Sequence, residues 1–475
     1  MKIIFEFVFI VLLLSCISGH NNSVVEEVFS WSKIEYESLP KSEYAQVGPY
    51  RYYIPENNNI GSFGYHPASG IFIVTIDRLR PGIPTSLGAF CVNDYNLTSN
   101  TNSPKFWGFP NYRINELQDY HFWSIKARHN ENAVLNKLQD FTPVEEYNSK
   151  SYIDRNPQWH QTSFYKKQSF KKIISVFHLT IDDKCNRVFF MDNGQVQYYQ
   201  NTTHIMQKPA LWAITLPENG CETRSFPTDR HAELPDNVAA KGSNGFVHVF
   251  LDYQLGNSCD DLFVYTTNTF YNHLTVYDYS KHEFWTIHHQ TFEPVVSESY
   301  FIFDKTFHYQ MNMGLYSMSL GYPDKFGDRT AYYTLTAGTA QYEVSTKVFK
   351  DRNYSANQKP DDFRIMGYRG CNHQSFKTVI DYTHGVMFYS EIQTNQLRCW
   401  NIKKPLNPDN IGIVFESEYF DSGLQTFVDS KGHLWFYSSQ MPILLTSDLP
   451  LDLNKVNNRI FRTKVSYAIR GTVCE

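Results

Sequence analysis

The segment that decides the fold reads Thr378-Val-Ile-Asp-Tyr-Thr-His-Gly-Val-Met-Phe-Tyr389. It contains an apolar strand, a turn opened by Asp381 and a second strand rich in aromatic and β-branched residues. This pattern is typical of a β-hairpin, which cannot bury its apolar face alone. Related hairpins occur at residues 62–74, 178–190, 247–265, 315–335 and 424–437. Repetition at intervals of roughly 40 to 70 residues is typical of blades around an axis. The sequence therefore predicts an all-β fold, a six-bladed β-propeller of four-stranded blades.

The outer strands of three blades can also be placed in the sequence. Apolar and aromatic runs at 275–279 and 284–287 complete the third blade, those at 342–346 and 363–367 the fourth, and those at 398–402 and 412–415 the fifth. We expect an N-terminal strand at residues 29–36 to pair with a C-terminal strand at 459–463. This pairing would close the ring and protect the sheet edges.

The chain of 475 residues has no Gly/Ser-rich or Pro-rich linker, so residues 20–475 are predicted to form a single propeller domain. The interval between the first two repeats is too long for one blade. The excess, residues 111–171, is predicted to be an insertion between blades 1 and 2, with a short amphipathic helix at 134–141. It could be a lid, a partner-binding flap or a tolerated surface loop.

The N-terminus has the pattern of a secretory signal peptide over residues 1–19. Lys2 precedes an apolar stretch from Ile3 to Ile17, and the small residues Ser18 and Gly19 follow. The stretch is too short to span a membrane. A bacterial lipoprotein box that would acylate Cys16 is an alternative. The sequence favours a secreted protein that is not anchored in a membrane.

Cysteine usage agrees with an oxidising compartment, where disulfides are expected. Removal of the signal peptide leaves an odd number of cysteines, so one is free or pairs between chains, which leaves the oligomeric state open. The chain contains no CxxC pair, and this argues against a structural zinc site. Sequons predict glycosylation at Asn21, Asn96, Asn201 and Asn353.

No motif for catalysis or for a cofactor is present. The chain lacks a GxSxG motif and a Gly-rich phosphate loop, and its net charge of −5 gives no electrostatic footprint for nucleic acid. The acids at the hairpin turns, Asp182, Asp252, Asp381 and Asp429, are interpreted as turn residues rather than as a catalytic ring. His282, His288 and His289 are interpreted as surface residues rather than as metal ligands. We therefore predict no catalytic residue, no metal and no cofactor.

A ligand site is easier to place than a reaction. Propellers bind ligands at a channel mouth, where loops entering the inner strands meet loops leaving the second strands. Polar residues of these loops are predicted to line the site: Asn58, Asn59, Asp192, Asn193, Thr267, Asn268, Asn372, Gln374, Thr394, Asn395 and Ser439. Aromatic rings such as Phe63, Tyr65 or Phe246 would stack on the ligand or face its cation. The alternative is that these polar groups only bond to loop backbones and water.

Several ordered segments resemble the insect Yellow and major royal jelly protein family. They are residues 179–194, 274–279, 344–346, 369–370 with 374–375, 399–401, 404–405 with 408–410, 432–436 with 441–442, and 459–460. The resemblance covers roughly residues 29 to 462 and implies a secreted six-bladed propeller. The chain departs from the family pattern at 171–176, where a Cys is usual, and at Cys371, where Pro is frequent. Within this resemblance we expect disulfides Cys185–Cys259 and Cys371–Cys399.

The resemblance leaves three functions open. Salivary members of the family bind biogenic amines in the central channel, so the first hypothesis is a non-enzymatic protein that binds a small aromatic amine or a catechol-derived ligand, or that acts in cuticle pigmentation. The second is a dopachrome-converting enzyme of melanin synthesis, which would need a general base in the channel. The third is a structural extracellular protein with an empty channel.

Overall fold

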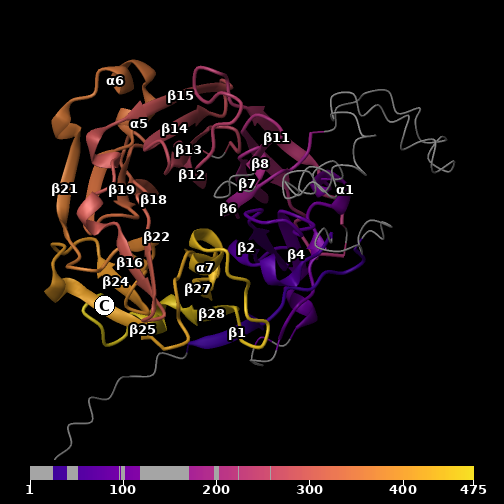
Figure 1. The fold of residues 1–475 in the computed structure, drawn as a ribbon. Coiled ribbons are helices and arrows are strands. Elements are labelled where there is room, and N and C mark those ends of the chain that lie inside the picture. Colours follow the sequence, from indigo (N-terminus) through magenta and orange to yellow (C-terminus); the bar gives the residue numbers. More distant parts are fainter. Residues whose placement is uncertain are drawn as a thin grey trace, which may run out of the picture.

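The computed structural model describes residues 25–39, 52–95, 97, 102–117, 171–196, 203–222, 224–256 and 258–475. Within these ranges, six four-stranded antiparallel sheets form a ring, and the chain passes around it from indigo to yellow in Figure 1. The predicted six-bladed propeller is thus confirmed. The predicted signal peptide, the predicted helix at 134–141 and nearly all of the predicted insertion lie outside the described residues, so the predicted domain boundaries stay predictions.

The strands of each blade run outward from the central channel in sequence order, except in blade 6. Blade 1 contains β2 (Ile60–His66), β3 (Ile71–Ile76), β4 (Leu87–Cys91) and β5 (Trp107–Gly108). Blade 2 contains β6 (Val176–Asp182), β7 (Arg187–Asp192), β10 (Ala210–Thr215) and β11 (Thr228–Glu233). Blade 3 contains β12 (Phe246–Tyr253), β13 (Leu262–Asn268), β14 (His273–Asp278) and β15 (Glu283–His288).

The remaining blades follow the same plan. Blade 4 contains β18 (Leu315–Pro323), β19 (Arg329–Leu335), β20 (Ala340–Ser345) and β21 (Phe363–Tyr368). Blade 5 contains β22 (Ser375–Asp381), β23 (Val386–Glu391), β24 (Gln396–Asn401) and β25 (Ile411–Glu416). Blade 6 contains β26 (Thr426–Val428), β27 (His433–Ser439), β28 (Asn458–Lys464) and β1 (Glu26–Trp31). The outer strands predicted for blades 3, 4 and 5 are all present.

Strand β1 closes the ring as predicted, because it pairs with β28 in blade 6 (Figure 1). Phe29 pairs with Ile460, and Trp31 pairs with Asn458. The strand ends at Trp31, earlier than expected from the sequence. Beyond it, Tyr36 makes a single parallel bridge to Phe106, next to blade 1. The N-terminal segment therefore completes one blade and then crosses to its neighbour.

Short elements decorate the ring. Two hairpins lie outside the blades, β8 (Gln195–Val196) with β9 (His204–Ile205) and β16 (Tyr300–Phe303) with β17 (Phe307–Gln310). The short helices are α1 (Tyr112–Asn115), α5 (Lys347–Lys350), α6 (Arg352–Ala356), α7 (Met441–Thr446) and α8 (Val465–Ala468). Among the described residues, no helix has the length and apolar character needed to cross a membrane.

Large aromatic side chains fill the spaces between blades. Phe72 of blade 1 stacks on Phe63, with ring centroids 5.2 Å apart, and lies 5.8 Å from the Trp435 ring of blade 6. Trp435 is fully buried and stacks in turn on Phe427. Because such rings bury much apolar surface, they account for the aromatic content of 16% noted for the whole chain.

Three disulfides connect distant parts of the chain. Cys185–Cys259 joins the inner hairpin turns of blades 2 and 3, as predicted, and Cys91–Cys221 joins blades 1 and 2. The predicted Cys371–Cys399 pair is wrong: Cys399 pairs with Cys474, and Cys371 is free and exposed. The reason is that the chain folds back after α8 and brings Cys474 against Cys399 in the buried cluster of blades 5 and 6.

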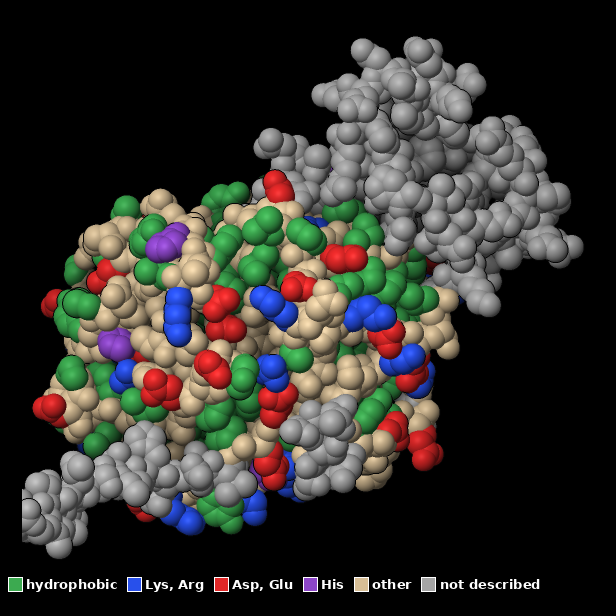
Figure 2. Space-filling model, turned by 60° about the horizontal axis from the view of Figure 1, so that its bottom comes forward, with side chains coloured by type: hydrophobic (Ala, Val, Ile, Leu, Met, Phe, Trp, Pro, Cys, Tyr) green, Lys and Arg blue, Asp and Glu red, His purple; other side chains and the backbone are tan. Residues whose placement is uncertain are grey.

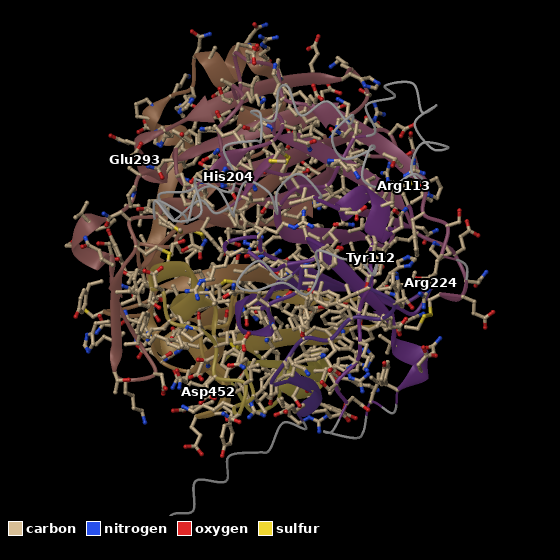
Figure 3. All side chains as sticks on the ribbon, turned by 45° about the vertical axis from the view of Figure 1, so that its right-hand side comes forward. Tyr112, Arg113, His204, Arg224, Glu293 and Asp452 are labelled. Carbon is tan, nitrogen blue, oxygen red and sulfur yellow. A yellow bond between two sulfur atoms is a disulfide. The ribbon has the colours of Figure 1, made fainter. Side chains whose placement is uncertain are left out.

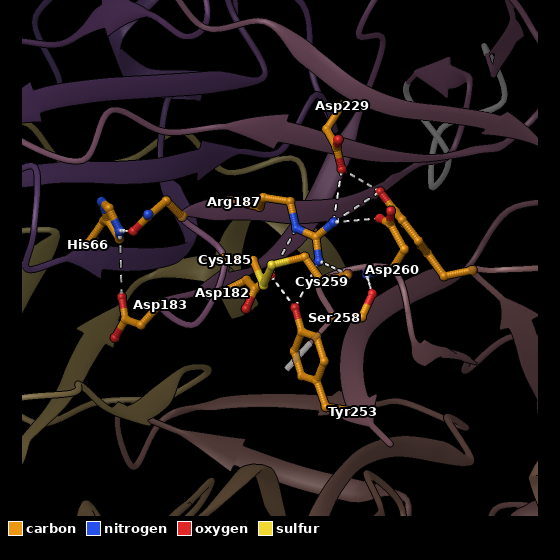
Figure 4. A network of polar contacts seen from close by, with 12 residues as sticks. His66, Asp182, Asp183, Cys185, Arg187, Asp229, Tyr253, Ser258, Cys259 and Asp260 are labelled. Carbon is orange, nitrogen blue, oxygen red and sulfur yellow. Dashed lines mark hydrogen bonds and ion pairs between the residues drawn. A yellow bond between two sulfur atoms is a disulfide. The ribbon is translucent and has the colours of Figure 1, made fainter. Parts of the chain in front are cut away.

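A buried guanidinium reinforces the Cys185–Cys259 bridge (Figure 4). The side chain of Arg187 donates to Asp182 Oδ2 at 3.0 Å and to the carbonyl oxygen of Cys259 at 2.6 Å. Tyr253 of blade 3 also donates to Asp182, at 2.6 Å. A buried charge needs such partners, so this network holds blades 2 and 3 together beside the disulfide.

The outer edge of blade 1 is short and is covered by side chains rather than by a longer strand. The Arg224 guanidinium lies 4.2 Å from the centre of the Trp107 ring of β5. Tyr112 of α1, labelled near Arg224 in Figure 3, donates to the carbonyl oxygen of Glu37 at 2.6 Å. On the face seen in Figure 2, acidic and basic side chains are interspersed, with no large area of one sign.

Candidate functional site: the central channel

Five of the six inner strands carry a β-bulge near their first residues. The register shifts lie between Ile60 and Ser62 in β2, Val176 and Leu179 in β6, Phe246 and Val249 in β12, Leu315 and Ser317 in β18, and Ser375 and Thr378 in β22. A bulge removes residues from the ladder and re-aims their side chains, and bulges occur often next to active sites. The residues released here are Gly61, Phe177, His178, Val247, His248, Tyr316, Phe376 and Lys377. They are the centre of the candidate site.

The channel has a small cavity at the loop mouth, which we define as the end where loops enter the inner strands and leave the second strands. Its volume is about 50 Å³. The lining residues are Gly61, Asp77, Phe177, His178, Val247, Thr269, Phe270, Met311, Met313, Tyr316, Phe376, Leu424, Met441, Pro442 and Leu445. Most of these side chains are apolar or aromatic.

Asp77 is the carboxylate of the small cavity. It follows β3, and no hydrogen bond reaches its buried Oδ1 atom from the described residues. The adjacent Arg78 does not pair with it, because its guanidinium donates to backbone carbonyls such as that of Ile174 at 2.7 Å. Burial raises the pKa of Asp77 well above its usual value, and a hydrogen bond from Thr75 offsets only part of this effect. An incoming cation would restore the charged carboxylate.

Gly61 makes room for this carboxylate. A Cβ atom at position 61 would lie 2.3 Å from Asp77 Oδ1, which is closer than atoms pack. The backbone angle of Gly61 lies in an ordinary region, so space rather than conformation requires glycine here. The bulge of β2 and the absence of a side chain together leave room for the Asp77 carboxyl group.

A larger cavity of about 580 Å³ occupies the channel at the turn mouth, the end at the hairpin turns between inner and second strands. Its walls come from all six inner strands and include Phe63, Tyr65, Phe250, Phe427, Lys377 and Gln425. Asp182, Asp183, Asp381, Asp429, Tyr382 and Ser430 line it from the hairpin turns. This volume is within the range of small-molecule sites.

A buried cluster of four polar side chains connects the two cavities. His178 lines the small cavity and Lys377 lines the large one. Lys377 Nζ lies 3.4 Å from His248 Nδ1, and His178 Nε2 lies 3.1 Å from the Tyr316 hydroxyl oxygen. The centroids of the two imidazole rings are 3.9 Å apart.

Burial disfavours the charged forms of the two histidines and the lysine. It lowers the pKa of Lys377 to about 7, and no acidic side chain counters the effect. Burial also holds the pKa of His178 well below its ordinary value, with a smaller effect from Lys377, and the pKa of His248 is lowered in the same way by burial, His178 and Lys377. Neutral imidazoles beside an amine that titrates near neutral pH are suited to general acid–base chemistry.

Seven of the eleven polar residues predicted from the sequence lie in loops of the loop mouth. The other four, Asp192, Thr267, Asn268 and Ser439, lie at the ends of second strands, and none of the eleven lines either cavity. Asn59 Nδ2 donates to Ser439 Oγ at 2.8 Å, and the amide of Asn193 exchanges two hydrogen bonds with the backbone of Phe246. The others with such bonds are Asn58, Asp192, Thr267, Asn268, Gln374, Thr394 and Asn395, whose partners are loop backbone groups or neighbouring side chains. Asn372 is exposed in a left-handed backbone conformation.

These contacts match the alternative interpretation, in which the side chains bond to loop backbones. A role in binding stays a prediction. Of the three rings named with them, Phe63 and Tyr65 line the large cavity, whereas Phe246 packs between blades 2 and 3.

The turn acids and the histidines also make local contacts. Asp429 accepts a hydrogen bond from Trp435 Nε1 at 2.8 Å, and Asp252 accepts one from the Tyr265 hydroxyl at 2.8 Å. His282 contacts Arg230, and His289 stacks on Phe363, so these two histidines do not converge. Among the residues that the structure describes, no three His, Cys, Asp or Glu side chains are placed to hold a metal ion.

The comparisons with known proteins agree with the resemblance seen in the sequence. The sequence model of the major royal jelly protein family matches residues 174–474. The chain belongs to this family. A Yellow-related salivary protein, ASP4 of Phlebotomus orientalis, is 33% identical over 64% of this chain and 74% of its own length.

Two other relatives match nearly the full length of the present chain. The Yellow-related salivary protein LJM111 of Lutzomyia longipalpis is 26% identical over 95% of this chain and 94% of its own. L-dopachrome tautomerase yellow-f of Drosophila melanogaster is 26% identical over 98% of this chain and 99% of its own. The family thus includes members named for a tissue and a member named for a reaction, and neither name transfers to this chain by similarity alone.

Proposed function

We propose that this protein binds a protonated aromatic amine or a related catechol-derived cation in the small cavity, with Asp77 as the counter-ion. The observation that carries the proposal is the buried Asp77 Oδ1, which faces a cavity of aromatic and methionine side chains without a partner among the described residues. A carboxylate in such surroundings gains a strong charge-assisted hydrogen bond from an ammonium group. The walls offer Phe177, Phe270 and Phe376 to the ring.

The small cavity must enlarge to accept an aromatic ring. A benzene-sized ligand occupies a cavity of roughly 150 Å³ in a protein core, compared with about 50 Å³ here. Met311, Met313 and Met441 line the cavity, and methionine side chains change conformation easily. We expect these three side chains to move when the ligand enters.

The test is a calorimetric titration with serotonin, dopamine and histamine, performed on the wild type and on Asp77→Asn. The proposal expects binding of at least one amine that Asp77→Asn weakens at least tenfold. Asp361→Asn is the matched control, because Asp361 is exposed and lines neither cavity. Equal affinity of Asp77→Asn and wild type would reject Asp77 as the counter-ion.

A second function, proton transfer in dopachrome conversion, is favoured by a separate observation. Tautomerisation needs a base that takes a proton from carbon and an acid that returns one to oxygen. Lys377 lines the large cavity and lies 3.4 Å from His248 behind it, so the two side chains could fill these roles. The relative named L-dopachrome tautomerase covers nearly the whole chain and makes this reaction worth testing.

The assay follows the absorbance of dopachrome with wild type, Lys377→Met, His248→Gln and Lys403→Met, and we expect the first two variants to slow its conversion. Lys403 is exposed, so its substitution controls for a general effect of lysine loss. Decay of dopachrome no faster with protein than with buffer would reject this function.

Two further features bear on the proposal. The three disulfides support our proposal that the protein is secreted. The two cavities weigh against a purely structural role.

A further inference from the structure

Lys377, which the second proposed function uses as an acid or base, has an unusual environment for a lysine. Its side chain lines the large cavity, yet only 7% of the residue is exposed. No acidic side chain among the described residues forms an ion pair with it, and its nearest polar contact is the neutral imidazole of His248. A lysine that is structural is normally paired or reaches solvent, and this one does neither.

We propose that Lys377 is a carbonyl-reactive amine that captures a small aromatic aldehyde in the large cavity as an imine. The Nζ lone pair attacks the carbonyl carbon, and a carbon–nitrogen bond forms. The carbonyl oxygen then leaves as water with both protons of the amine, so the step needs no oxidant or reductant. His248, at 3.4 Å, is placed to relay the first of these protons from nitrogen to oxygen.

The surroundings favour an aromatic aldehyde over other carbonyl compounds. The Phe250 ring centre lies 5.8 Å from Lys377 Nζ, and Phe63 and Phe427 also line the cavity. The volume of about 580 Å³ accommodates a substituted benzene ring beside the amine. The aromatic rings near the amine also favour its unprotonated, nucleophilic form.

Chemical reactivity at neutral pH separates this lysine from exposed ones. Burial lowers the pKa of Lys377 to about 7, so a large part of its amine is neutral at pH 7. An ordinary lysine with a pKa of about 10.4 is neutral in well under one part in a thousand. Reactive lysines in enzymes are activated by the same removal of the amine from water.

The experiment incubates the wild-type protein at pH 7 with 4-hydroxybenzaldehyde and sodium cyanoborohydride, which reduces the imine to a stable secondary amine. Digestion and mass spectrometry then locate the adducts. We expect Lys377 to be labelled at least tenfold faster than the exposed Lys403, and 4-hydroxybenzyl alcohol, which cannot form an imine, to slow the reaction by competition. Labelling of Lys377 no faster than Lys403 would overturn the inference.

Two variants separate this inference from the proposed functions. Asp77→Asn should lose amine binding but keep the Lys377 adduct, since Asp77 lines the other cavity. His248→Gln should slow the labelling of Lys377 several-fold without changing that of Lys403. An intact adduct in a protein that binds no amine would reject the amine function alone, and amine binding without the adduct would reject the imine alone.

Discussion

Lys377 Nζ and His248 Nδ1 lie 3.4 Å apart, although their strands belong to blades 5 and 3, which are separated by blade 4. The contact therefore crosses the channel rather than a blade interface. It exists only when the ring is assembled, because 129 residues separate the two in sequence. The Lys377–His248 contact therefore depends on the assembly of the propeller.

The free energy of unfolding should depend on the charge of Lys377. The pKa of Lys377 is about 7 in the folded protein and 10.5 for an ordinary lysine, so the unfolded chain binds more protons between these pH values. This group therefore makes the fold more stable as pH rises through that window, by up to about 1.4 kcal/mol per pH unit. Lys377→Met removes the effect.

Urea unfolding of wild type and Lys377→Met at pH 7, 8 and 9 measures the difference. We expect the advantage of the variant over wild type to be largest at pH 7 and to narrow by pH 9. Lys403→Met should track the wild type at each pH. A difference between Lys377→Met and wild type that stays constant would contradict the depressed pKa of Lys377.

Gly61→Ala should disturb the small cavity without unfolding the protein. The added Cβ would meet Asp77 Oδ1 at 2.3 Å, and this carboxyl group is the end of a side chain that can rotate away. We expect amine affinity to fall at least tenfold while the melting temperature changes by a few degrees. Titration calorimetry and thermal unfolding provide the two readouts, and unchanged affinity would place the amine elsewhere.

Amine binding should strengthen as pH rises. Burial raises the pKa of Asp77, so the empty protein binds a proton at this carboxyl group more readily than the complex does, and the bound ammonium favours its release. Release of one proton increases the association constant by up to about tenfold per pH unit, as long as the free carboxyl is protonated and the ligand is cationic. Calorimetry in buffers of different ionisation enthalpy measures the released proton. Affinity independent of both pH and buffer would contradict this coupling.

The disulfide between Cys399 and Cys474 should contribute strongly to stability. It closes a loop of 75 residues and lies in the buried cluster of blades 5 and 6. Its loss through Cys474→Ala should lower the free energy of unfolding by about 2–5 kcal/mol. Cys371→Ser is the control, and its effect should be small because Cys371 is exposed and unpaired. Equal stability of the two variants would contradict this assignment.

The ring of blades could be predicted from the sequence because a hairpin is encoded by residues that are close together in the chain. Each strand pair, such as Thr378–Tyr389 with Asp381 in its turn, is encoded within a dozen residues, and repetition implies the rest. Closure by β1 was predicted from a general rule instead, because an unpaired edge strand needs a partner. Pairing of Cys399 depended instead on how the chain turns after α8, which no local pattern encodes.

Less of the site could be predicted from the sequence, because β-bulges determine which side chains face the channel. Asp77 lies just beyond the first repeat, in the type of loop where the ligand was expected, and no periodic signal distinguishes it from Asp94. His178, His248 and Lys377 occupy positions that alternation alone would assign to one or the other face of a strand. A register shift in each strand brings them together. Neither the bulge nor the contact across the channel can be derived from one strand.

The pairing of β1 with β28 sets an order of events during synthesis. A ribosome makes residues 26–31 first, but their partners at 458–462 emerge last. The earliest strand must therefore wait unpaired until almost the whole chain has been translated, while blades 1 to 5 have all their strands available sooner. Completion of translation therefore sets the earliest moment at which the ring can close. The central channel cannot be complete before that moment.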